Sequence, residues 1–106
     1  MYVVSLASVA GLWGVMNNAG IAGELGPPEW LSVQAYKDVA AINTYGLIDV
    51  SMTFLPLVKL ERGRIVNTAS IYGRMTLANI APYAVSKYGV EAFTDGLRLV
   101  VFCFRV

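Results

Sequence analysis

Two short apolar runs, each ending in small polar residues, constrain the fold of this chain more than any other feature. They read "GVMNNAG" at residues 14–20 and "RIVNTAS" at residues 64–70. Each has the length of a strand, and the Asn, Gly and Ser residues mark where the strand gives way to a turn. The stretch between them exceeds the dozen residues that a crossover between parallel strands needs. The pattern therefore predicts two buried, parallel strands.

The connection between the two runs has the period of a helix. Ser32 is a candidate N-cap, and apolar residues recur at helical spacing from Tyr36 to Phe54. Pro56 is expected to bend or end this helix, and Gly63 closes the segment before the second strand.

A second helix is expected from Tyr83 to Val101, because Pro82 suits the first turn of a helix. The order is then strand, helix, strand, helix. Alternation of this kind predicts an α/β fold with a parallel sheet and right-handed crossovers. With 106 residues, the chain forms a single domain at most.

Composition excludes several classes of function. Hydrophobic residues make up 57% and charged residues 14%, against about a quarter charged in an average protein. This predicts that some apolar surface meets a partner. The net charge of +1 is scattered, so nucleic-acid binding has no basic footprint. One cysteine and no histidine exclude an ordinary zinc or transition-metal site. The longest apolar run, residues 99–104, is too short to span a bilayer, so no transmembrane helix is expected.

The chemistry-bearing residues follow the predicted strands. Residues 17–20 and Ser70 lie at strand ends, and the carboxyl ends of parallel strands share one edge of the sheet. Tyr83 and Lys87 lie four residues apart on the helix that follows, hence on one helix face. A phenol held beside an ammonium group ionises more easily, as an acid/base tyrosine requires. These groups are therefore expected to converge on one crevice.

Taken singly, each of these features has a structural explanation. A Tyr–Lys pair at this spacing is more often a solvated pair on a helix surface. Ser70 alone reads as a turn serine, and Asn43 alone as a polar residue of a helix. Residues 17–20 alone read as a turn that could serve any fold. Only the joint occurrence, in this order, favours a catalytic site.

Together these motifs resemble the short-chain dehydrogenase/reductase family. The resemblance rests on "NNAG" at residues 17–20, Asn43 within "INTYG", Ser70, and "YAVSK" at residues 83–87, with twelve residues between the serine and the tyrosine. Stretches such as "GRIVNTASIYGRM" and "SKYGVEAFTDGLR" resemble the retinol and 17-beta-hydroxysteroid dehydrogenase branch, close to 3-hydroxybutyrate dehydrogenases. The resemblance covers about residues 11–98. It implies a partial Rossmann-type, doubly wound parallel sheet forming one partial domain over residues 1–106.

The resemblance also implies roles for individual residues. Tyr83 would be the general acid/base, and Lys87 would make its phenol easier to ionise and hydrogen-bond the nicotinamide ribose. Ser70 would donate a hydrogen bond to the substrate oxygen. Asn43 would hold a water in a proton relay behind Lys87. The residues implied to contact the cofactor are Asn17, Asn18, Ala19, Gly20, Tyr83 and Lys87.

The function implied is NAD(P)-dependent hydride transfer to or from an alcohol or ketone of a retinoid-like or steroid-like lipid. The sequence does not distinguish NAD from NADP, and no metal is implied. The family's glycine-rich turn and its last strands are not found, so the domain is expected to be truncated at both ends. Residues 2–9 could supply a substitute strand.

The alternative is a catalytically inactive truncated relative that cannot hold cofactor and associates with a full-length partner. Helices equivalent to residues 32–57 and 83–101 build the dimer interface in relatives, so self-association is expected. The resemblance implies a cytoplasmic or endoplasmic-reticulum-associated location.

Overall fold

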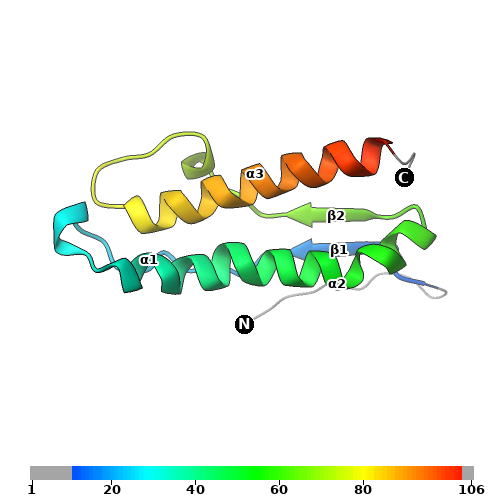
Figure 1. The fold of residues 1–106 in the computed structure, drawn as a ribbon, viewed down its shortest axis with the longest axis horizontal. Coiled ribbons are helices and arrows are strands. Elements are labelled where there is room, and N and C mark those ends of the chain that lie inside the picture. Colours follow the sequence, from blue (N-terminus) through cyan, green and yellow to red (C-terminus); the bar gives the residue numbers. More distant parts are fainter. Residues whose placement is uncertain (1–10, 104–106) are drawn as a thin grey trace.

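A computed structural model describes the backbone of residues 11–103 and the side chains of residues 11–101. Strand and helix alternate in the expected order (Figure 1). The elements are β1 (Gly14–Asn17), α1 (Val33–Ala40), α2 (Leu47–Leu60), β2 (Arg64–Asn67) and α3 (Ala81–Cys103). The proposed substitute strand at residues 2–9 lies outside the described residues.

The two strands pair in parallel, as the sequence predicts, with Val15 opposite Ile65 and Asn17 opposite Asn67. Both are shorter than the apolar runs suggested. Pairing stops at the asparagine of each strand, and residues 18–20 and 68–70 belong to the loops that follow. The predicted site residues Asn18, Ala19, Gly20 and Ser70 therefore lie in these loops and not in the strands.

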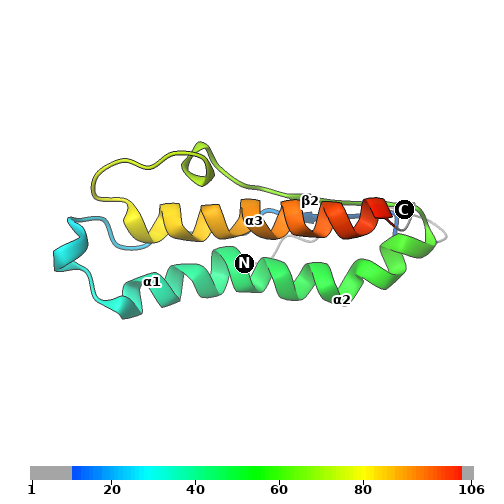
Figure 2. The ribbon, with the colours of Figure 1, turned by 45° about the horizontal axis from the view of Figure 1, so that its top comes forward.

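The helices cover one face of the sheet (Figures 1 and 2). Val15 and Asn17 of β1 are buried on this face, and Ile65 of β2 points the same way. On the other face Met16 is 43% exposed and Val66 52% exposed. The prediction that β2 is a buried strand is therefore wrong for the residues described, because only alternate side chains of a strand meet the helix layer.

The long first helix begins where the sequence predicted. The Ser32 hydroxyl accepts a hydrogen bond from the Ala35 amide at 3.3 Å, which confirms the N-cap. The helix does not end at Pro56, because α2 continues to Leu60. Proline removes the hydrogen bond to the carbonyl four residues earlier, and that residue, Met52, is exposed, so water can satisfy the carbonyl.

An unforeseen π-helix, Ala41–Gly46, joins α1 to α2 without a break. The combined helix Val33–Leu60 has 28 residues and a mean hydropathy of 1.3 in its most apolar window. By length and composition alone it could cross a membrane, although polar residues such as Asn43 and Asp49 interrupt its apolar runs. The core helix of a soluble protein meets the same two criteria, and this helix packs its buried residues against β1 and α3. Only 28% of the apolar window is buried, so much of its surface is open.

Helix α3 begins one residue before Pro82, as predicted, and runs beside α1 and α2 in the same direction (Figures 1 and 2). Gly89 permits this close packing. A Cβ atom at Gly89 would lie 2.9 Å from Cγ2 of Thr44, so any side chain there would push the π-helix away. The contact places Asn43 and Thr44 against the turn of α3 that carries Tyr83 and Lys87.

Candidate active site

The predicted site residues gather at the carboxyl ends of the strands. There the loops after β1 and β2 meet the π-helix Ala41–Gly46 and the first turns of α3. This is the edge that the sequence pattern predicts, because parallel strands end together there. The residues concerned are Asn17, Asn18, Ala19, Gly20, Asn43, Ser70, Tyr83 and Lys87.

Lys87 is the buried cation of this edge. It is 4% exposed, and its Nζ donates a hydrogen bond to the Thr68 carbonyl oxygen at 2.8 Å. Burial lowers the pKa of the Lys87 ammonium group, because desolvation disfavours the charged form. Nζ lies 5.7 Å from the centre of the Tyr83 ring. The structure therefore brings the predicted tyrosine–lysine pair together.

Gly20 lies beside the buried side chains of Asn43 and Lys87. A Cβ atom at this position would lie 3.3 Å from Oδ1 of Asn43 and 3.6 Å from Nζ of Lys87. The three residues come from a strand-end loop, a π-helix and α3, so their meeting is a tertiary feature. A Cβ atom would thus fit tightly against Oδ1 of Asn43 and in ordinary contact with Nζ of Lys87, so a side chain that extends beyond Cβ would press on both polar groups.

Asn43 is fully buried, and its side-chain amide makes three hydrogen bonds. Oδ1 accepts from the Ile21 amide at 2.8 Å, while Nδ2 donates to the Ile21 carbonyl at 2.8 Å and to Oγ of Ser86 at 2.9 Å. Both amide protons are thus committed to protein atoms. The side chain holds the loop after β1, and a water relay at this residue would have to use its main-chain carbonyl or the remaining lone pair of Oδ1.

Ser86 and Thr44 were not predicted. The Ser86 hydroxyl donates to the Tyr83 carbonyl at 2.7 Å while it accepts from Asn43, and Oγ1 of Thr44 donates to the Ser86 carbonyl at 2.8 Å. These bonds join the π-helix to the turn of α3 between Tyr83 and Lys87. The available signal was position: Ser86 sits inside "YAVSK", and Thr44 follows Asn43.

Ser70 follows β2 and caps a short 3-10 turn, Ile71–Gly73. Its Oγ accepts a hydrogen bond from the Tyr72 amide at 3.2 Å. The hydroxyl proton is not used in this bond, so Ser70 can still donate. The Tyr72 ring meets the Tyr83 ring edge to face, with centroids 6.1 Å apart and planes at 76°.

The two asparagines of "NNAG" point in different directions. Nδ2 of Asn17 donates to Oγ of Ser51 at 2.9 Å and to Oδ1 of Asn67 at 2.8 Å, inside the core. Oδ1 of Asn18, at the surface, accepts from Oγ1 of Thr68 at 3.0 Å. Asn17 therefore fixes the strand end, as the sequence suggested, with its side chain turned toward the helices. Asn18 ties the loop after β1 to the loop after β2.

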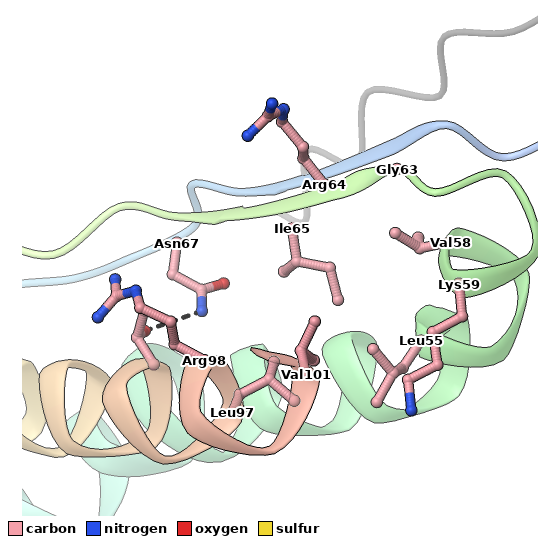
Figure 3. A pocket seen from close by; sticks show the side chains of 11 residues that line it. Leu55, Val58, Lys59, Gly63, Arg64, Ile65, Asn67, Leu97, Arg98 and Val101 are labelled. Carbon is pink, nitrogen blue, oxygen red and sulfur yellow. Dashed lines mark hydrogen bonds between the residues drawn. The ribbon is translucent and has the colours of Figure 1, made fainter. Parts of the chain in front are cut away.

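A cavity of about 260 Å³ lies at the other end of the strands, among the C-terminal parts of α2 and α3 and β2 (Figure 3). Apolar side chains such as Leu55, Ile65 and Leu97 line it (Figure 3). Asn67 and Thr94 also line it, and Nδ2 of Asn67 donates to Oγ1 of Thr94 at 3.0 Å. None of the predicted site residues lines this cavity. We place the candidate active site at the loop edge instead, because the chemistry-bearing side chains converge there.

Comparison with known proteins gives one consistent family. A sequence model described as short chain dehydrogenase matches residues 3–101. Retinol dehydrogenase 16 of Rattus norvegicus is 50% identical over 96 residues, which is 91% of this chain and 30% of that protein. The D-beta-hydroxybutyrate dehydrogenase, mitochondrial, of Bos taurus is 48% identical over 88 residues, which is 83% of this chain and 25% of that protein. The chain thus spans about 30% of the length of the first of these relatives.

Solved structures agree with this likeness. A short chain dehydrogenase from Escherichia coli CFT073 complexed with NADPH superimposes with a TM-score of 0.81 at 32% identity. The match covers 86% of this chain and 38% of that chain. The two-stranded sheet and its helices therefore correspond to part of an α/β fold of Rossmann type.

Proposed function

Because the chain belongs to the short-chain dehydrogenase family, we propose that its loop-edge site serves hydride transfer between a nicotinamide cofactor and an alcohol or ketone. The observation that carries the proposal is the meeting of Lys87, Asn43 and Gly20 beside the Tyr83 ring. The relatives named above act on retinol and on hydroxybutyrate, by their names. Another relative, at 50% identity, is a 17-beta-hydroxysteroid dehydrogenase of Bos taurus. We propose a lipid-like alcohol or ketone of the retinoid or steroid class as substrate.

The residues present fit NAD or NADP at two points. Lys87 offers three N–H donors, of which one goes to the Thr68 carbonyl, so the others can bind ribose hydroxyl groups. Gly20 leaves the backbone bare above Lys87, where a Cβ would otherwise fill the space. The cofactor, when bound, supplies or accepts the hydride. Asn18 and Ala19 adjoin this position and would border the cofactor.

The chain's own residues would then move the proton. The Tyr83 hydroxyl gives a proton to the carbonyl oxygen of the substrate, or takes one from its alcohol. Lys87 places a positive charge 5.7 Å from the ring centre, which stabilises the phenolate as the proton leaves. Ser70 donates its free hydroxyl proton to the same substrate oxygen, where negative charge develops. Asn43 holds the loop that frames these groups.

Cofactor binding tests the proposal directly. NADH and NADPH fluorescence is followed as the chain is titrated in, for the wild type, Lys87→Ala and Lys37→Ala. We expect saturable binding that Lys87→Ala weakens and Lys37→Ala, a change at an exposed lysine of α1, leaves unchanged. Turnover of retinol and of a steroid alcohol is then compared with Tyr83→Phe, which should abolish turnover and retain cofactor binding. Equal turnover by Tyr83→Phe would refute the role of Tyr83.

A second candidate function rests on the exposed apolar surface. Leu57, Leu60, Leu99 and Val100 of α2 and α3 are exposed, as are Met16 and Val66 on the open face of the sheet. This surface supports a chain that does no chemistry alone and associates with a copy of itself or with a full-length relative. Sedimentation at increasing concentration, with and without a full-length relative, separates the cases. For the cellular location we propose the cytoplasm or the endoplasmic reticulum, to be tested by fractionation.

A further inference from the structure

We propose that Tyr72 is a positioning residue that holds Ser70 and Tyr83 in register for the reaction, an inference that rests on the proposed function. Its main chain contacts the serine and its ring contacts the tyrosine. It thus joins the loop after β2 to the first turn of α3. Neither the order of the motifs nor their spacing pointed to it.

The main-chain contact settles what the Ser70 hydroxyl can do. Oγ of Ser70 accepts from the Tyr72 amide at 3.2 Å, so the bond uses an oxygen lone pair and not the proton. The hydroxyl is fixed in place and remains a donor. A serine that must donate to a developing oxyanion needs this combination.

The Tyr72 ring contacts the second residue, Tyr83. Edge-to-face aromatic pairs are favourable with centroids between 4.5 and 7 Å apart, and the pair of Tyr72 and Tyr83 lies at 6.1 Å and 76°. Lys87 approaches the same Tyr83 ring at 5.7 Å. The plane of the Tyr83 ring is therefore set by Tyr72 together with Lys87.

The turn that carries Tyr72 is itself held against α3. A Cβ atom at Gly73 would lie 2.9 Å from the Lys87 carbonyl oxygen and 2.8 Å from Cγ of Glu91, so the turn packs on the helix backbone. The next residue, Arg74, forms an ion pair of 2.6 Å with Glu91. The turn that carries Tyr72 is therefore fixed against α3, and a residue that positions catalytic groups needs such support.

The test separates the ring of Tyr72 from its main chain. Tyr72→Phe keeps the ring, whereas Tyr72→Leu keeps apolar bulk and the amide donor but removes the ring. Tyr88→Leu is the matched control, because Tyr88 is an exposed tyrosine next to Lys87 on the same helix. Carbon-13 tyrosine labelling gives the rate at which the Tyr83 ring flips, with the signal assigned by its loss in Tyr83→Phe.

We expect Tyr72→Leu to speed the flipping of the Tyr83 ring by about two- to twelve-fold, the factor that corresponds to one edge-to-face pair. Tyr72→Phe and Tyr88→Leu should leave the rate unchanged. Where the wild type turns over substrate, kcat should fall by a similar factor in Tyr72→Leu with unchanged KM for cofactor, and Tyr72→Phe should restore it.

An unchanged flip rate in Tyr72→Leu overturns the inference, whether or not the chain is active. A wild type without turnover refutes the proposed function and leaves the ring measurement standing. Thermal unfolding is recorded for each variant, and Tyr72→Met provides the same comparison should Tyr72→Leu fail to fold.

Discussion

Replacing Asn43 by leucine tests whether its amide holds the site together. The change keeps the approximate volume and removes three hydrogen bonds. Two of them go to the Ile21 backbone, which is partly exposed, so water recovers much of the loss and each costs about 0.5–1 kcal/mol. The third leaves the buried Ser86 hydroxyl without its donor, at about 1–2 kcal/mol. The sum predicts a loss of about 2–4 kcal/mol in the free energy of unfolding.

The assay is urea denaturation followed by circular dichroism, with Asn18→Ala as the control at an exposed asparagine of the adjoining loop. Hydrogen exchange at the Ile21 amide gives a local readout, and its protection should disappear in Asn43→Leu. A loss below about 1 kcal/mol, or Ile21 protection equal to that of the wild type, would refute the assignment of Asn43 as the loop's anchor. Asn18→Ala loses only the exposed hydrogen bond from Thr68, so it should cost about 0.5–1 kcal/mol, less than Asn43→Leu.

Two further predictions concern the groups above and beside Asn43. Burial lowers the pKa of Lys87 in the folded state below the 10.5 of an exposed lysine. At pH values between the folded-state pKa and 10.5, the folded chain therefore binds fewer protons than the unfolded chain. The free energy of unfolding should therefore rise with pH across that window in the wild type, and the rise should be smaller in Lys87→Met when unfolding is measured at several alkaline pH values. Gly20→Val should press on Oδ1 of Asn43 and Nζ of Lys87 and weaken NADH binding at least tenfold, whereas Gly96→Ala, at a position with open space around it, should leave the Kd unchanged.

Local signals in the sequence predicted the elements well. Ser32 and Pro82 mark helix starts through chemistry that acts within one turn, so the sequence alone reveals them. The asparagines that follow each apolar run likewise marked where pairing ends. Pro56 did not end the helix, which continues to Leu60, although a proline inside a helix costs about 3 kcal/mol; packing of the helix against the sheet and α3 outweighs this local signal.

The hydrogen bonds between different helices and loops could not be predicted from the sequence. The Tyr83–Lys87 pair was predicted because both residues lie on one helix. The bonds that join Asn43 to Ile21 and Ser86, and Lys87 to the Thr68 carbonyl, cross three elements and leave no periodic trace. The π-helix around Asn43 was also invisible, since it differs from an α-helix by one residue in its hydrogen-bond spacing.

The paired asparagines of the two strands have a consequence for folding fidelity. A two-stranded sheet with one open face has little apolar packing to oppose slippage of one strand along the other. A shift of β2 by one residue would turn Asn67 to the open face of the sheet. Asn17 would stay in the apolar layer and lose its hydrogen bond to Asn67. A one-residue shift would therefore leave one N–H of the buried Asn17 amide without its partner, while the bond to Ser51 remains. If two copies of the chain exchange strands, the Asn17–Asn67 bond favours the native alignment over one shifted by a single residue.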